Sequence, residues 1–118
     1  MSDTNTILDL INAGIQAENV RQKAIASNFA NFETPGYRRL DVKFEEVLAA
    51  CSGSDEGDLS LAEPEIYEPK QTPVNANGND TSLETEVGEM IKNSLRHKAY
   101  IRLLSKKYNQ IELAIGTR

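Results

Sequence analysis

The strongest structural signal in the sequence lies in residues 82–115, SLETEVGEMIKNSLRHKAYIRLLSKKYNQIELAI. A row of mostly apolar residues, which we call the seam, recurs there in an unbroken alternation of three and four residues. This is the heptad spacing of a coiled-coil helix. Thr81 or Ser82 is placed to cap its start, and Gly116 is placed to end it. At 1.5 Å per residue this helix is about 50 Å long. It cannot cover its own apolar face, so it must lie against the N-terminal helix, other subunits or both. The seam consists of Val87, Met90, Ser94, His97, Ile101, Leu104, Tyr108, Ile111 and Ile115.

A second helix is predicted over residues 5–31, where two neighbouring rows of apolar side chains form a broad face. Glu18 and Gln22 interrupt the first row. The helix ends before Thr34-Pro35-Gly36, because the residue before a proline disfavours helix and glycine tolerates positive φ. The first row is Leu8, Ile11, Ile15, Ile25, Phe29 and Phe32, and the second is Leu10, Ala13, Ala17, Val20 and Ala24.

The middle of the chain has a different character and divides a single structural domain into three parts. Residues 1–50 comprise the N-terminal helix, the turn and a short extension, which ends in a helical turn at Glu45–Ala50. Residues 51–80 combine Pro, Gly, Ser and Asn with seven acidic groups and one Lys, which predicts a flexible acidic loop. The short piece 65–67 is its candidate strand. Residues 81–118 hold the heptad helix.

The composition excludes several classes of function. The net charge is −5 and the pI about 4.9, whereas nonspecific nucleic-acid binding needs a basic footprint. We therefore expect no nucleic-acid partner. No apolar run approaches the length of a membrane span, so we expect no membrane insertion. No positively charged start with an apolar run follows the pattern of a cleavable signal. The single cysteine, Cys51, rules out an intrachain disulfide and is interpreted as a small filler.

Catalytic, cofactor and metal sites are not expected. The one histidine, His97, falls on the apolar seam, where a partly buried structural residue is favoured over a catalytic base. One His and one Cys cannot build a zinc site. The paired carboxylates lie in a polar loop or in the first turns of helices, where solvation and the helix dipole explain them. No enzyme is predicted.

The basic side of the C-terminal helix supports two interpretations of equal weight. It is either a solvated face opposite the seam or an electrostatic surface for acidic partners in an assembly. The residues concerned are Lys92, Arg96, Lys98, Arg102, Lys106 and Lys107.

Residues 26–37, ASNFANFETPGY, contain the most specific motif of the chain. Amides at a helix end bond to the backbone there, Pro-Gly turns the chain, and a tyrosine after the turn gives an amphipathic anchor. The motif resembles the N-terminal signature of the bacterial flagellar rod and hook proteins. Residues 89–96 and 104–108 are similar to the C-terminal helix of proximal-rod members. Phe29 and Phe32-Glu33 depart from the usual pattern, and the middle segment is short for the family. The motif residues are Asn28, Asn31, Thr34, Pro35, Gly36 and Tyr37.

The resemblance implies a mostly α fold in which long N- and C-terminal helices pack as an antiparallel, coiled-coil-like pair around an irregular or disordered acidic middle segment. It also implies a structural subunit of the basal-body rod, which crosses the periplasm, transmits torque and is exported by the flagellar type III apparatus without signal cleavage. The expected partners are copies of itself, other rod proteins, the rod-to-ring adaptor and the export apparatus. The expected assembly seam is Val87, Met90, Ile101, Leu104, Tyr108 and Ile111.

Two alternatives remain open at this point. Another axial protein of the same family has the same N-terminal motif, although the runs at 93–96 and 104–108 argue against it. A cytoplasmic coiled-coil adaptor or chaperone has similar heptads, but it does not need the Asn and Thr-Pro-Gly-Tyr turn and it forms a stable dimer in solution.

Overall fold

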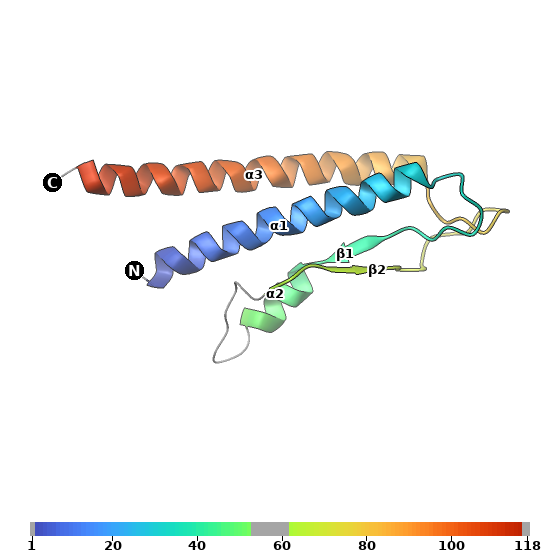
Figure 1. Cartoon of the computed structure of the whole chain (residues 1–118), viewed down its shortest axis with the longest axis horizontal. Helices are drawn as coiled ribbons and strands as arrows, with labels where there is room; N and C mark the ends of the chain where they lie inside the picture. Colours follow the sequence, from blue (N-terminus) through green and yellow to red (C-terminus); the bar gives the residue numbers. More distant parts are fainter. Residues whose placement is uncertain (1, 53–61, 117–118) are drawn as a thin grey trace.

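The computed structural model describes residues 2–52 and 62–116 as three long, thin layers (Figure 1). Helix α1 (Ser2–Ala30) lies in the middle, with α3 (Leu83–Gly116) antiparallel to it on one side. Strand β1 (Asp41–Lys43), helix α2 (Glu45–Ser52) and strand β2 (Glu65–Tyr67) lie on the other side. The molecule measures 67 × 30 × 15 Å. The predicted pair of long terminal helices is confirmed, and its bounds differ by a few residues from those expected.

Helix α1 ends in the turn that its sequence predicts. The amide of Tyr37 donates a hydrogen bond to the carbonyl of Thr34 at 3.2 Å, and Gly36 has a φ of 76°. Proline at the second position of such a turn and glycine with positive φ at the third are typical of type II geometry. The chain then runs back along α1 as β1.

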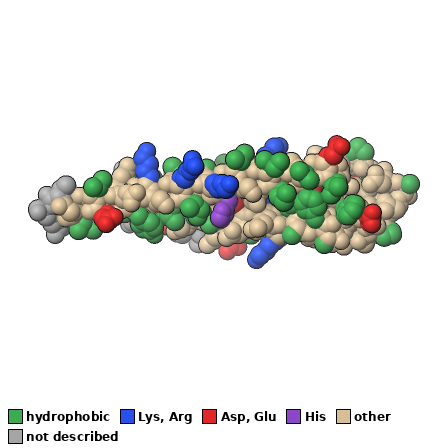
Figure 2. All heavy atoms as spheres, turned by 90° about the horizontal axis from the view of Figure 1, so that it is seen from above, with side chains coloured by type: hydrophobic (Ala, Val, Ile, Leu, Met, Phe, Trp, Pro, Cys, Tyr) green, Lys and Arg blue, Asp and Glu red, His purple; other side chains and the backbone are tan. Residues whose placement is uncertain are grey.

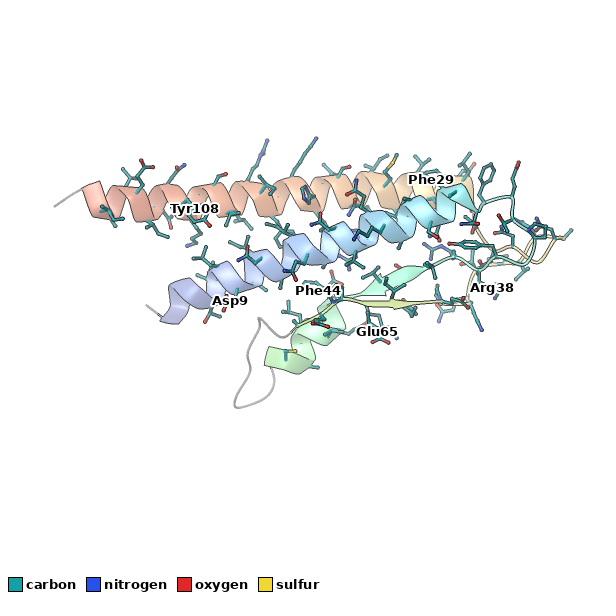
Figure 3. The ribbon with its side chains drawn as sticks, in the orientation of Figure 1. Asp9, Phe29, Arg38, Phe44, Glu65 and Tyr108 are labelled. Carbon is teal, nitrogen blue, oxygen red and sulfur yellow. The ribbon has the colours of Figure 1, made fainter. Side chains whose placement is uncertain are left out.

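The third layer is small and partly apolar. Strands β1 and β2 pair antiparallel with Val42 opposite Ile66, and the predicted extension and strand are both present. Phe44 follows β1 and is 1% exposed, since it packs with Ala13, Ala17 and Ala62 (Figure 3). The amino group of Lys43 lies 4.4 Å from the centre of the Tyr67 ring, a cation–π contact across the two strands. This layer therefore covers the side of α1 that faces away from α3.

The described part of the acidic middle segment, residues 62–80, is more regular than its composition predicts. Residues 75–79 form a turn in which Gly78 has a φ of 84° and donates a hydrogen bond to the carbonyl of Asn75. A side chain at Gly78 would lie 3.4 Å from the Cα of Gly36, so the two glycine turns touch. The tertiary contact, rather than local propensity, orders this end of the segment. The rest of the predicted loop, residues 53–61, lies outside the described residues.

The contact between the two long helices is polar. Glu86 and Asn93 are the buried residues of α3, and Tyr100 continues their seven-residue spacing. The Tyr100 ring lies over Gly14, where an added Cβ would come within 2.3 Å of it. At 3.6 residues per turn, the apolar seam predicted from the sequence lies to one side of this row. We call Glu86, Asn93 and Tyr100 the contact row.

Candidate functional site

Asn28 is the centre of a hydrogen-bond network where α1 meets the returning chain. Its amide nitrogen donates to the carbonyl of Leu40 at 2.9 Å and to Oε2 of Glu86 at 3.0 Å. Its carbonyl oxygen accepts from the amide of Leu40 at 2.8 Å and from the hydroxyl of Tyr37 at 2.9 Å. A fully buried asparagine is tolerated only when its donors and acceptors are satisfied. Here the side-chain amide donates two hydrogen bonds and its carbonyl oxygen accepts two. The motif residues Asn28 and Tyr37 thus tie α1, β1 and α3 together.

The remaining motif residues close the end of α1. Asn31 donates from its side chain to the carbonyl of Ser27 at 2.9 Å, as expected for an amide at a helix end. Asn79, from the distant loop, donates to the carbonyls of Asn31 and Thr34, both at 2.8 Å. Free carbonyls at a helix C-terminus need such donors. Asn79, which lies 45 residues after Thr34 in the chain, therefore caps the C-terminal end of α1.

Acidic side chains from α3 and its leading loop hold the arginines after the turn. The guanidinium Nε of Arg39 donates to Oε1 of Glu86 at 2.9 Å, and its backbone amide donates to Oδ1 of Asp80 at 2.6 Å. Arg38 lies 3.5 Å from the other oxygen of Asp80. Burial opposes the charge of Arg39, but the hydrogen bonds and the negative charges of Glu86 and Asp41 together outweigh it, so the pKa of this guanidinium is raised. The pairing fixes β1 against the first turn of α3.

Glu18 organises a second ionic cluster in the middle of the helix pair. Its carboxylate accepts from Arg21 at 2.6 Å, from Arg96 at 2.7 Å and from Asn93 at 3.0 Å. Arg21 also donates to Glu45 at 2.7 Å. Burial lowers the pKa of Arg21, but the hydrogen bonds and negative charges of Glu45 and Glu18 together raise it by more, so the net shift is upward. One carboxylate therefore links α1, α3 and, through Arg21, α2.

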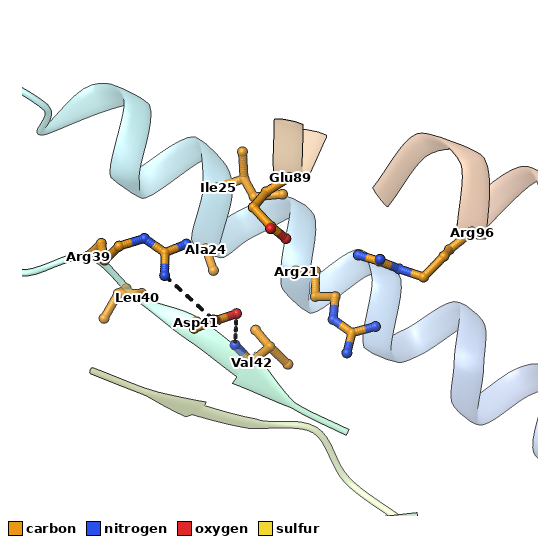
Figure 4. Close-up of a pocket in the computed structure, with 9 residues that line it drawn as sticks. All are labelled: Arg21, Ala24, Ile25, Arg39, Leu40, Asp41, Val42, Glu89 and Arg96. Atoms are coloured by element: carbon orange, nitrogen blue, oxygen red, sulfur yellow. Dashed lines mark hydrogen bonds and ion pairs between the residues drawn. The ribbon is translucent and has the colours of Figure 1, made fainter. Parts of the chain in front are cut away.

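A small recess lies among these charged side chains, between α1, β1 and α3 (Figure 4). Its volume is about 10 Å³, which is room for about one water molecule. Asp41 faces it and accepts from the amide of Val42 at 2.8 Å. Among residues 2–52 and 62–116, no group of three or more His, Cys, Asp or Glu side chains is placed to hold a metal ion. The recess therefore suits a structural water and not a substrate.

None of the helices in the described part of the chain is both long enough and apolar enough to span a membrane.

The predicted assembly seam is largely open to solvent. Val87, Met90, Ile101 and Tyr108 are exposed, whereas Leu104 and Ile111 are half-buried. Hydrophobic side chains are spread along the upper surface of the molecule (Figure 2). A groove of about 270 Å³ runs beside the contact row, between α1 and α3. We call the six seam residues the α3 flank. The groove is lined by Gln22, Ile25, Ala26, Phe29, Met90, Asn93 and Ser94.

Sequence reasoning missed most of the buried polar residues. Glu18 was visible as an interruption of an apolar row, which is the signal of a paired charge inside a helix contact. Glu86 and Asn93 are seven residues apart, but polar residues at that spacing are also found on exposed faces. Asn79 and Asp80 gave no signal, because loops ordinarily contain both residue types.

Comparison with known proteins agrees with the motif. A family model described as "Flagella basal body rod protein" matches residues 13–38, which contain Glu18, Asn28 and the turn. The flagellar basal body rod protein FlgB of Bacillus subtilis (strain 168) is 27% identical over 122 residues, covering 95% of this chain and 94% of the relative. The FlgB protein of Borreliella burgdorferi is 22% identical and covers 98% and 99%. That of Cereibacter sphaeroides (strain ATCC 17023) is 29% identical and covers 80% and 82%. With the turn and the paired terminal helices, these matches show that the chain is similar to the flagellar basal body rod proteins of the FlgB type over most of its length.

Proposed function

We propose that this chain is a structural subunit of the proximal rod of the flagellar basal body. The observation that carries the proposal is the match to relatives named flagellar basal body rod protein FlgB, which extends over nearly their whole length. The geometry is compatible with it, because most of the exposed large hydrophobic side chains of the described residues lie on α3, and the recess beside the ionic clusters has room for only about one water. We assign no enzymatic reaction to this chain.

The assembly surface in this proposal is the α3 flank. Monomeric soluble proteins rarely expose long apolar stripes, and an exposed stripe marks a surface that a partner covers. Polar contacts hold α1 against α3, so the apolar side chains of the α3 flank are free to pack against neighbouring copies and other rod proteins. The groove beside Phe29 and Met90 would receive side chains of a neighbour in the same contact.

The position in the basal body is part of the proposal. The rod that this subunit builds crosses the periplasm, contacts the rod-to-ring adaptor and transmits torque. Export by the flagellar type III apparatus, without cleavage of a signal, delivers the subunit. The support for these points is the resemblance of the Asn28–Tyr37 motif, together with an ion-paired hairpin that is suited to carrying load without changing shape.

Localisation in the native bacterium tests the proposal. A strain lacking the gene is complemented with a tagged copy, and basal bodies are isolated and probed for the tag. We expect the deletion to abolish swimming and the tagged chain to be present in the rod fraction. A deletion strain that swims normally, with the tagged chain absent from basal bodies, would contradict the proposal. A Lys23→Gln variant, changed at an exposed position of α1, serves as the matched control that should complement fully.

A further inference from the structure

Helix α3 carries an uninterrupted block of positive charge. Residues 90–111 contain six Lys or Arg and no Asp or Glu. Lys98, Arg102 and Lys106 follow each other at four-residue spacing, so like charges face each other along the helix and disfavour it. The outer face of α3 shows Lys and Arg side chains among hydrophobic ones (Figure 2). A solvated helix face usually mixes both signs, and an acidic partner would relieve this repulsion.

The block surrounds a shallow depression on the side of α3 turned away from α1. Its volume is about 490 Å³. Within the described ranges, Lys98, Arg102 and Lys106 have no ion pair, whereas Arg96, on the inner side, is taken up by Glu18. The depression thus offers apolar contact with unpaired cations at its rim. It is lined by Leu95, Lys98, Ala99, Arg102, Leu103 and Lys106.

The complementary charge lies on the opposite side of the molecule. Glu46 of α2, Glu63 just before β2 and Glu65 at the start of β2 are exposed, and none has an ion pair among the residues that the structure describes. Ile66 beside them is 53% exposed, so this surface also presents an apolar side chain. Helix α1 separates the layer of α2 and β2 from α3 (Figure 1). The acidic and basic surfaces of one chain therefore cannot meet.

We propose that the basic depression of α3 in one copy binds the exposed acidic surface of α2 and β2 in a neighbouring copy. Two different surfaces on opposite sides of one chain make a head-to-tail contact, which generates rings or helical arrays rather than closed dimers. Charge complementarity sets the register, while Leu95, Leu103 and Ile66 supply apolar area. This contact differs from the α3 flank, and it rests on the proposed function because it assigns one lateral neighbour within the rod.

Charge exchange tests the pairing. Lys98→Glu with Arg102→Glu reverses one surface, and Glu63→Lys with Glu65→Lys reverses the other. Each pair should lower incorporation into isolated basal bodies on the order of tenfold, because like charges then oppose each other. The chain with all four changes should recover most of the loss. All four positions are exposed, so circular dichroism of each variant should match that of the wild type, and Lys23→Glu serves as the control. The inference is wrong if the chain with all four changes is incorporated no better than either double variant, or if both double variants are incorporated normally.

Cross-linking identifies the occupant and separates this inference from the proposed function. Two differently tagged copies are expressed together in a Cys51→Ala background, one with Lys98→Cys and the other with Glu65→Cys. A short bismaleimide applied to isolated basal bodies should give a product that carries both tags, whereas Lys23→Cys in place of Lys98→Cys should give none. Both tags in the basal body without a joint product, or a product with another rod protein, would overturn the inference and leave the proposed function intact. Absence of both tags from the basal body would overturn both.

Discussion

On the face of α3 that meets α1, the buried side chains are Glu86 and Asn93, at 0% and 6% exposure. On the adjacent flank, Met90, Ile101 and Tyr108 are 45%, 41% and 58% exposed. A helix of a free-standing domain would show the reverse, with apolar residues inside and polar residues outside. The two faces therefore serve different contacts. The polar face specifies how one chain folds, and in the proposed rod the apolar face would be covered by neighbouring subunits.

The difference has a physical reason. A buried carboxylate is tolerated only with well-placed donors, so Glu18 and Glu86 accept one register of α1 against α3 and reject others. Apolar contacts are non-directional and roughly proportional to area, so they provide affinity without fixing a register. A subunit that must fold before it assembles gains from keeping the two kinds of contact apart. The predictions below change one face at a time.

Removing the carboxylate of Glu18 should have the largest effect. Glu18→Ala leaves Arg21 and Arg96 without their common acceptor, and loss of one partner from a buried ion pair costs about 3–5 kcal/mol. Since Arg96 is partly exposed, we expect the lower end of that range. Urea unfolding followed by circular dichroism measures it. Asp9→Ala, in the same helix and outside the cluster, should change the free energy of unfolding by less than about 0.5 kcal/mol. Equal effects of the two changes would contradict the assigned role of Glu18.

A charge on the flank should affect assembly but not folding. Ile101 is exposed in the subunit, so Ile101→Asp should leave the urea midpoint nearly unchanged. In the rod it would forfeit roughly 1.5–3 kcal/mol of apolar burial per subunit and add an unpaired charge. The same change at Leu104 should also block assembly, but because this side chain is half-buried in the subunit we expect it to lower the urea midpoint as well. We expect loss of swimming in soft agar while immunoblots show normal amounts of protein. Normal swimming by both variants would show that the flank is not buried in the rod.

A methyl group at Gly14 should separate the helices at the contact row. A Cβ there would meet the Tyr100 ring at 2.3–2.9 Å, and overpacking of this kind costs about 1–3 kcal/mol. Gly88→Ala is the matched control, because it lies in α3 with nothing within 4 Å of the added atom. That change should stabilise the helix by roughly 0.5–1 kcal/mol. Thermal melts of both variants test the sign of each shift, and a stabilising Gly14→Ala would contradict the close approach.

The smallest effect is expected at Glu45, at the edge of the Glu18 cluster. Burial raises its pKa, but the hydrogen bond from Arg21, a backbone hydrogen bond and the positive charges of Arg21 and Arg96 together lower it by more, so the folded-state pKa lies below the usual value. The pair therefore stabilises the fold above the unfolded-state pKa of about 4.3, and this contribution is lost as pH falls through the folded-state pKa. Since Glu45 is largely exposed, we expect roughly 0.2–1 kcal/mol at neutral pH. Glu45→Gln should remove that pH dependence. An unchanged acid transition in the variant would argue against the pair.

Local signals predicted the elements well. The proline and glycine after Thr34 located the turn, the heptad spacing located α3, and the alternation after Arg39 located β1. The pair of long helices followed from their length, because neither can cover an apolar face alone. These features depend on residues near one another in sequence, where propensity and spacing carry the information.

The buried polar contacts were not predictable in the same way. Asn79 caps α1 across 48 residues of separation from Asn31, and Glu86 meets Asn28 across 58. The sequence shows that these residues are polar, but their partners depend on how the chain returns. The predicted apolar seam lies along one side of α3, and α1 packs beside it, since ion pairs and the Gly14–Tyr100 contact decide which face of α3 is covered.

Labelling of a single thiol shows whether the α3 flank is covered in the rod. In a Cys51→Ala background, Ile101→Cys is reacted with a maleimide in the purified subunit and in isolated basal bodies, with the chain unfolded in urea giving the full rate. We expect fast labelling in the subunit, close to the rate of the unfolded chain, and strong protection in the basal body. Labelling that is equally fast in both would contradict the claim that the apolar face of α3 is reserved for neighbours.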